Sequence, residues 1–149
     1  MNSKQPLPIN ILVADDDKND RLLFDMALKE IPLATRLKTV SDGEKLMDYL
    51  SKNSENLPDV IFLDLNMPRK NGSECLKEIK KNEKLKRLPV IIYSTSLREN
   101  IADVLFQNGA HYYLPKCNYN MLIKHIYKTL TLLAEDPNQP ARNKFMLSL

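Results

Sequence analysis

The 149-residue sequence predicts an α/β fold, a doubly wound parallel sheet of five strands with helices on both faces. The first observation is that five short apolar runs of strand length recur along the chain. The second is that the segments between these runs carry apolar residues at helical spacing. Alternating strands and helices indicate a parallel sheet, because parallel neighbours need a long crossover connection.

The expected strands are residues 9–14 (INILVA), 36–40 (RLKTV), 60–63 (VIFL), 90–93 (VIIY) and 111–114 (HYYL). Two of them, 60–63 and 90–93, are apolar throughout, which is typical of central strands that are buried on both faces. The run at 36–40 mixes charged and apolar residues. We therefore expect it at an edge of the sheet.

Five helices are expected between and after these strands. Their apolar faces are marked by Leu23, Met26, Ala27 and Ile31; by Leu46, Met47 and Leu50; by Leu76 and Ile79; by Ile101, Val104 and Leu105; and by Leu122, Ile123, Ile126, Leu130 and Leu133. Ser41–Glu44 and Ser96–Glu99 have the spacing of a capping box at a helix start. Asn108–Gly109 is a helix stop signal.

The length suits one domain, which we place at residues 8–134. Residues 135–149 carry two prolines and no periodicity, which predicts a C-terminal tail with a mobile end and no output domain. Phe145, Met146 and Leu147 are apolar residues of this tail with which it could dock on the domain or on a partner.

Charge and composition exclude several classes of function. The net charge of +3 does not favour nucleic-acid binding, and the basic stretch 77–87 is interleaved with glutamates, as on a solvated helix face. No stretch approaches the roughly 20 apolar residues that span a bilayer, and the N-terminus lacks the apolar core of a signal peptide. We expect a cytoplasmic protein with Cys75 and Cys117 as free thiols.

Polar side chains gather where the expected strands end. They are Asp15, Asp16 and Asp17 after the first strand, Asp64 after the third, Ser94 and Thr95 after the fourth, and Lys116 after the fifth. Each has a structural explanation by itself, since an aspartate such as Asp17 is a common helix N-cap. In an open parallel sheet, however, ligands bind beyond the carboxyl ends of the strands. Their convergence indicates a reactive site.

The chemistry expected at this edge is phosphoryl transfer with Mg²⁺. Two negative charges ~4 Å apart repel by about 4 kcal/mol at an effective dielectric near 20, so clustered carboxylates need a cation. An all-oxygen site of few carboxylates suits Mg²⁺. A carboxylate beside this ion can attack phosphorus and form an aspartyl phosphate, and positioning with charge neutralisation supplies most of the catalysis.

Four separated motifs resemble those of the receiver domain of two-component response regulators. They are the acidic pair in ILVADDD, LDLNMP around Asp64, PVIIYST around Ser94 and YYLPK ending at Lys116. The resemblance covers roughly residues 8–134 and implies the sheet order 2-1-3-4-5. It also implies a sensor histidine kinase as the phosphoryl donor and a protein target downstream.

The resemblance implies roles for the matching residues. These are Asp64 as the phosphoacceptor; Asp15, Asp16, Asp64 and the backbone carbonyl of Asn66 as metal ligands; Ser94, Thr95 and Lys116 as phosphoryl-binding residues; and Ser94 with Tyr113 as the switch. In this scheme Tyr113 turns inward after phosphorylation. The surface of the fourth helix, fifth strand and fifth helix changes with it.

Two positions depart from the family pattern. Cys117 stands where the family carries a proline after the lysine, with a cis peptide between them. A cis bond before a non-proline costs roughly 3 kcal/mol, so either that strain is retained to aim Lys116 or the loop runs differently. Thr95 stands where a smaller residue is usual, and its bulk predicts slower attack by water and a longer phosphorylated lifetime.

A narrower resemblance concerns partners. The loops SKNSENLPDV and LKRLP and the C-terminal extension are similar to those of receivers that pair with bacterial phytochrome kinases. This implies a phytochrome-type kinase as partner. It also makes a homodimer plausible, through the fourth helix, fifth strand and fifth helix.

Three other functions fit parts of the pattern. A haloacid-dehalogenase-type phosphatase would need a general acid two residues after Asp64, where this chain has Asn66, so substrate turnover beyond self-phosphorylation and autodephosphorylation is not expected. A flavodoxin-like carrier would need a phosphate-binding loop where this chain has DDDKND. A receiver-like scaffold that is never phosphorylated stays open as the alternative.

Overall fold

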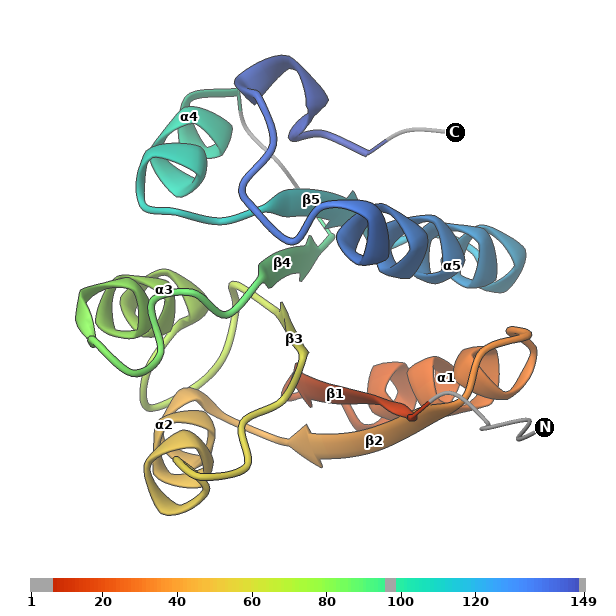
Figure 1. Ribbon diagram of the computed structural model, residues 1–149, viewed down its shortest axis with the longest axis horizontal. Helices are drawn as coiled ribbons and strands as arrows, with labels where there is room; N and C mark the ends of the chain where they lie inside the picture. Colours follow the sequence, from red (N-terminus) through yellow and green to blue (C-terminus); the bar gives the residue numbers. More distant parts are fainter. Residues whose placement is uncertain (1–6, 96–98, 148–149) are drawn as a thin grey trace, which may run out of the picture.

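The computed structural model describes residues 7–95 and 99–147 and contains one five-stranded parallel sheet (Figure 1). The strands are β1 (Ile9–Ala14), β2 (Thr35–Val40), β3 (Val60–Leu63), β4 (Val90–Ser94) and β5 (Tyr112–Pro115). They are arranged in the order β2-β1-β3-β4-β5. This order confirms the predicted sheet and places β2 at one edge, where its alternating exposed charges meet solvent.

Helices cover both faces of the sheet, as the alternating pattern predicts. They are α1 (Lys18–Lys29), α2 (Gly43–Lys52), α3 (Gly72–Lys81), α4 (Glu99–Gln107) and α5 (Tyr119–Glu135), followed by the short 3-10 helix η1 (Arg142–Lys144). In Figure 1, α1 and α5 lie on one face of the sheet and α2, α3 and α4 lie on the other. No helix in the described part of the chain is long and apolar enough to cross a membrane.

Two apolar clusters hold these layers together, one on each face of the sheet. On the α1–α5 face, Phe24 of α1 meets Phe62 of β3 edge to face, with ring centroids 4.9 Å apart. On the opposite face, Leu46 of α2 and Leu76 of α3 pack with Ile61 of β3. Burial on both faces explains why β3 and β4 are apolar throughout.

The starts of α1 and α2 show how capping side chains fix where a helix begins. Asp17 caps α1 as expected, since its side chain accepts a hydrogen bond from the Asp20 backbone N–H. The expected capping box at Ser41 is wrong. Asp42 caps α2 instead and accepts from the Lys45 N–H at 2.8 Å, because the helix starts one residue later than the Ser41–Glu44 spacing requires.

The remaining capping signals have different outcomes. The expected cap at Ser96 lies outside the described residues. A full capping box that was not expected is present in α3, where Asn71 and Glu74 each bond to the backbone of the other. Gly109 follows α4 with a φ of +100°, as the stop signal predicts.

The expectation of a mobile end is not met by the C-terminal residues that the structure describes. Phe145 is fully buried, and Leu147 is nearly so. The backbone around Met146 forms a parallel bridge with Tyr113 at the outer edge of β5. Three-dimensional contacts therefore order a segment that has no periodicity of its own.

Candidate functional site

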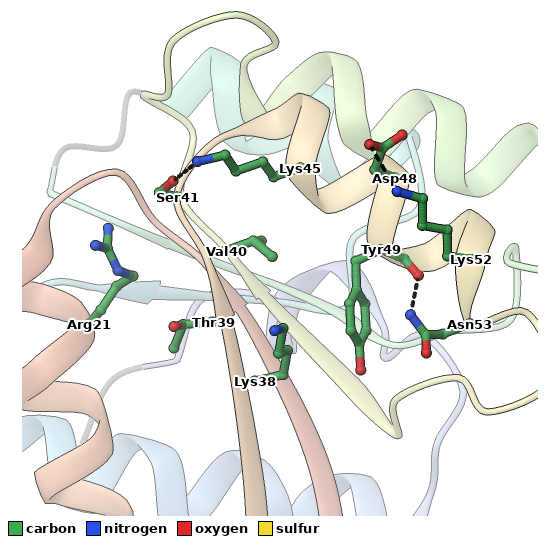
Figure 2. A pocket seen from close by; sticks show the side chains of 10 residues that line it. All are labelled: Arg21, Lys38, Thr39, Val40, Ser41, Lys45, Asp48, Tyr49, Lys52 and Asn53. Carbon is green, nitrogen blue, oxygen red and sulfur yellow. Dashed lines mark hydrogen bonds and ion pairs between the residues drawn. The ribbon is translucent and has the colours of Figure 1, made fainter.

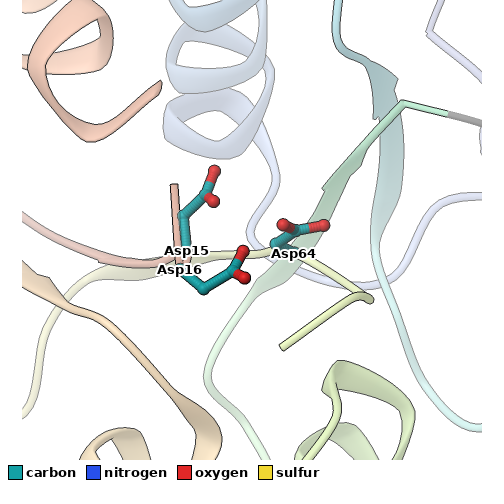
Figure 3. A group of neighbouring side chains, drawn as sticks. All are labelled: Asp15, Asp16 and Asp64. Atoms are coloured by element: carbon teal, nitrogen blue, oxygen red, sulfur yellow. The ribbon is translucent and has the colours of Figure 1, made fainter. Parts of the chain in front are cut away.

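Strand pairing brings the acidic residues together at one edge of the sheet. Ala14 of β1 lies opposite Leu63 of β3 in the parallel register, so the residues that follow them are neighbours. The backbone N–H of Asp64 donates to the Ala14 carbonyl at 3.0 Å and continues this pairing past the strand end. Asp15, Asp16 and Asp64 consequently each offer a carboxylate oxygen within 4.8 Å of the others (Figure 3).

Lys116 enters the same cluster from the end of β5. Its Nζ lies 2.7 Å from Asp15 Oδ2 and 3.4 Å from Asp64 Oδ2. Its backbone N–H donates to the Ser94 carbonyl at 2.8 Å, which extends the β4–β5 pairing and fixes the start of its side chain. No cis peptide occurs among the described residues, so the Lys116–Cys117 bond is trans and the ammonium reaches the carboxylates without it.

Burial and charge act against each other in this cluster. Asp15 is only 1% exposed, and this desolvation raises its pKa to about 6, against the opposing effect of the Lys116 hydrogen bond. Burial by itself lowers the pKa of Lys116, but hydrogen bonds to Asp15 and Asp20 outweigh it and raise that pKa overall. The lysine is therefore a firmly held cation among carboxylates.

Asp20 is the member of the cluster that sequence reasoning missed. Its Oδ2 lies 2.8 Å from Lys116 Nζ, closer than the carboxylate of Asp64. Asp20 lies in the first turn of α1, where an acidic residue is usual because of the helix dipole. Its distance in sequence from Lys116 hides the pairing, which only the folded chain creates.

A glycine allows α3 to start directly against the backbone of Asp64. A Cβ built on Gly72 would lie 2.2 Å from the Asp64 carbonyl oxygen, a distance that no side chain tolerates. The Gly72 N–H also donates to the Leu65 carbonyl at 3.0 Å. The loop between β3 and α3 is thereby closed tightly beneath the Asp64 side chain.

The remaining predicted residues surround this centre. The backbone N–H of Asn66 lies 3.3 Å from Asp64 Oδ1, which places the Asn66 backbone beside the cluster. Ser94 is buried at the end of β4, and its Oγ has no hydrogen-bond partner among the described residues. Thr95, next in the chain, is exposed. Tyr113 is buried, and its phenol donates to the Ser94 carbonyl at 3.3 Å.

Two hollows in the surface differ in character. One, of about 610 Å³, lies beside the cluster and is lined by Asp16, Asn66, Met67, Pro68 and Ile101 among others. The other, of about 440 Å³, lies at the β2 edge, where Arg21, Lys38, Lys45 and Lys52 surround it (Figure 2). Of these two, the first is lined by Asp16 and therefore adjoins the acidic cluster.

The cluster fits a hard divalent cation. All of its side-chain donors are carboxylate oxygens, and one of them, Asp16, is exposed beside the hollow. The convergence of three carboxylates is otherwise offset by the ammonium of Lys116. Oxygen donors at this spacing are those that Mg²⁺ and Mn²⁺ prefer.

Comparison with known proteins identifies the class to which this fold and site belong. Residues 11–127 match the family model described as the response regulator receiver domain. The chain therefore belongs to the response regulator receiver family, whose members are phosphorylated on an aspartate, bind divalent cations and act with histidine kinases and downstream targets.

Two response regulators are similar to this chain over most of its length. The response regulator Rcp1 of Synechocystis sp. is 33% identical over 146 residues, which is 95% of this chain and 99% of that protein. The crystal structure of the Mn(2+)-bound form of Rcp1 covers 90% of this chain and all of its own, with a TM-score of 0.77 and 34% identity. The phosphorylated cyanobacterial phytochrome response regulator RcpA, at 30% identity, covers 91% of this chain and all of its own, with a TM-score of 0.79.

Proposed function

We propose that this protein is a single-domain response regulator that accepts a phosphoryl group on Asp64 from the phosphohistidine of a sensor kinase. The observation that carries the proposal is the position of Asp64, which lies beside two further carboxylates and 3.4 Å from the Lys116 ammonium. In this assignment residues 8–134 form the receiver domain. We place the protein in the cytoplasm.

The reaction needs little from the protein beyond placement and charge. A carboxylate oxygen of Asp64 forms a bond to phosphorus while the P–N bond of the donor breaks, and the electron pair of that bond returns to the imidazole. Asp15, Asp16, Asp64 and the backbone carbonyl of Asn66 would hold Mg²⁺, which neutralises phosphoryl oxygens when bound. We assign no further substrate turnover to this site.

Lys116, Ser94 and Thr95 are the proposed contacts of the bound phosphoryl group. The Ser94 hydroxyl is buried at the strand end and lacks a hydrogen-bond partner among the described residues. This is expected of a group that donates a hydrogen bond to a phosphoryl oxygen once Asp64 is phosphorylated. Tyr113 is proposed as the switch residue, supported by its bond to the Ser94 carbonyl. Movement at Ser94 would then reach β5 directly.

The likeness to the cyanobacterial phytochrome response regulator RcpA supports a phytochrome-type kinase as the phosphoryl donor. We also propose a homodimer through α4, β5 and α5. This face exposes apolar side chains, with Ile101 and Val104 on α4 and Tyr127 on α5 at 37%, 50% and 42% exposure. A partner that covers them would gain hydrophobic free energy without rearranging the core.

The test is phosphoryl incorporation from acetyl phosphate in the presence of Mg²⁺, followed by intact mass. We expect the wild type to gain one hydroxylamine-labile phosphoryl group and Asp64→Asn to gain none. Asp48→Asn, which changes an exposed acid on α2, serves as the control and should behave as the wild type does. Steady turnover of p-nitrophenyl phosphate would instead favour a phosphatase, and the absence of both reactions would favour a scaffold.

A further inference from the structure

The C-terminal segment, residues 139–147, adds a short extra strand to the outer edge of β5, and it does so at Tyr113. The Tyr113 N–H donates to the Phe145 carbonyl at 2.9 Å, and the Leu147 N–H donates to the Tyr113 carbonyl at 3.0 Å. Both backbone groups of this one residue are thus bound by the segment. The same bridge covers an edge that would otherwise be open to another chain.

Side chains fasten the segment to α4 as well. Phe145 is fully buried and packs edge to face on Phe106 of α4, with ring centroids 5.6 Å apart. Gln139 donates to the backbone carbonyls of Phe106 and Ala110 at 2.7 and 2.9 Å. The segment therefore bridges α4 and β5, the strand that carries the proposed switch residue.

A further anchor is electrostatic. Arg142 Nη2 lies 2.7 Å from Asp103 Oδ1 on α4, and its guanidinium also lies 5.6 Å from the centre of the Phe145 ring. These contacts connect η1 to α4 and place the guanidinium against the Phe145 ring. The segment is held by backbone pairing, apolar burial and charge together.

The docked segment packs with the Tyr113 side chain in its inward position. Tyr113 and Phe145 belong to the same buried cluster, and the Tyr113 ring is 1% exposed with its phenol bonded to the Ser94 carbonyl. An outward turn of the ring would take it out of this cluster, so that its shared burial with Phe145 would be lost. The segment therefore stabilises the inward position.

We infer that residues 139–147 act as an intramolecular effector of the phosphorylation site, which stabilise the phosphorylated state by holding Tyr113 inward. This inference rests on the proposed function, in which phosphorylation of Asp64 favours the same inward position. Two events that favour one conformation must favour each other by the same factor. Phosphorylation then tightens the docking of the segment on α4 and β5, so that the docked segment becomes part of the surface that a partner meets.

The coupling is measured with beryllofluoride and Mg²⁺, which mimic a phosphoryl group on a carboxylate. Phe145→Ala should weaken the binding of beryllofluoride by about five-fold or more. Asp103→Asn, which removes only the ion pair on the surface of α4, should weaken it less but in the same direction. Asn143→Ala, an exposed change in the same segment, is the matched control and should leave the affinity unchanged.

Amide hydrogen exchange supplies the reciprocal measurement. Beryllofluoride should slow the exchange of the Tyr113 and Leu147 amides in the wild type, and should leave them unchanged in Asp64→Asn. A segment that only completes the fold would lower stability when altered, yet leave the affinity of the folded protein for beryllofluoride as it was.

The outcomes separate this inference from the function on which it rests. Phosphoryl incorporation at Asp64 together with equal beryllofluoride affinities for the wild type, Phe145→Ala and Asp103→Asn would overturn the inference alone. Failure of the wild type to take up either phosphoryl or beryllofluoride would overturn the proposed function and the inference together.

Discussion

At the scale of single residues, Lys116 connects the carboxylates of the site through three ion pairs. Its ammonium lies within 3.4 Å of carboxylates from the end of β1, from α1 and from the end of β3. Its pKa is raised because hydrogen bonds to Asp15 and Asp20 outweigh the effect of burial, so it stays charged at any physiological pH. A phosphoryl oxygen that arrives at Asp64 would therefore meet a fixed positive charge.

Replacing this charge should slow phosphoryl transfer more than it alters the fold. We expect Lys116→Met to reduce the rate of phosphoryl incorporation from acetyl phosphate by about 100-fold, the typical effect of removing one group that stabilises a developing charge. Lys124→Met changes a lysine on α5, away from the acidic cluster, and should leave the rate within error of the wild type. Equal rates for the two variants would show that the Lys116 ammonium takes no part.

At the residue scale, sequence reasoning found the groups that end strands and missed the one on a helix. Asp64 and Lys116 follow apolar runs, and the rule that parallel strand ends meet at one edge is enough to bring them together. Asp20 carries no such signal, because a first-turn acid is explained by its own helix. Its partner is separated from it by most of the chain.

At the scale of elements, the start of α3 determines where Asp64 can lie. The helix begins at Gly72, where the backbone approaches the Asp64 carbonyl more closely than any Cβ allows. Asn71 and Glu74 fix that start through their reciprocal capping bonds. The tight β3–α3 connection is therefore a structural requirement for the site as well as a helix cap.

Gly72→Ala tests this requirement. The added Cβ would meet the Asp64 carbonyl oxygen at 2.2 Å, so the backbone must shift, and we expect a loss of about 1–3 kcal/mol in the free energy of unfolding. Phosphoryl incorporation should fall as well, because the shift moves Asp64. Lys77→Ala, on the exposed side of the same helix, is the control for both urea unfolding and incorporation. Unchanged values for Gly72→Ala would contradict the close approach.

Element boundaries were predicted where periodicity and caps agree, and less well where they compete. Strands β3 and β4 follow from runs that are apolar throughout, as expected of strands buried on both faces of a sheet. The start of α2 was misplaced because Ser41 and Asp42 are both good caps, and only the path of the chain after β2 selects between them.

On the scale of the whole molecule, the sheet order joins the site to a distant surface. Strand β4 ends at Ser94, and the neighbouring strand β5 carries Tyr113. The C-terminal segment lies against the outer edge of β5. The hydrogen bond from the Tyr113 phenol to the Ser94 carbonyl connects the first two. Ser94, Tyr113 and the C-terminal segment thus form a continuous set of contacts from the end of β4 to the outer edge of β5.

The C-terminal segment was predicted only in part, for a physical reason: docking through its apolar residues was one of two expectations, and the mobile end was the other. Its polar residues and its single proline, Pro140, carry no period, so only Phe145, Met146 and Leu147 indicate where it could dock. Their burial depends on packing surfaces beside β5 that exist only once the sheet and its helices have formed. Contacts of this kind, between segments without secondary structure and a finished surface, leave no pattern in the sequence.

The most direct test of the account is to locate the phosphoryl group. After reaction with acetyl phosphate and Mg²⁺, borohydride reduces an aspartyl phosphate to homoserine, and peptide mass mapping then finds the altered position. We predict homoserine at position 64 alone, with Asp15 and Asp16 intact. Homoserine at position 15 or 16, or an unmodified Asp64 in a protein that has gained phosphate, would contradict it.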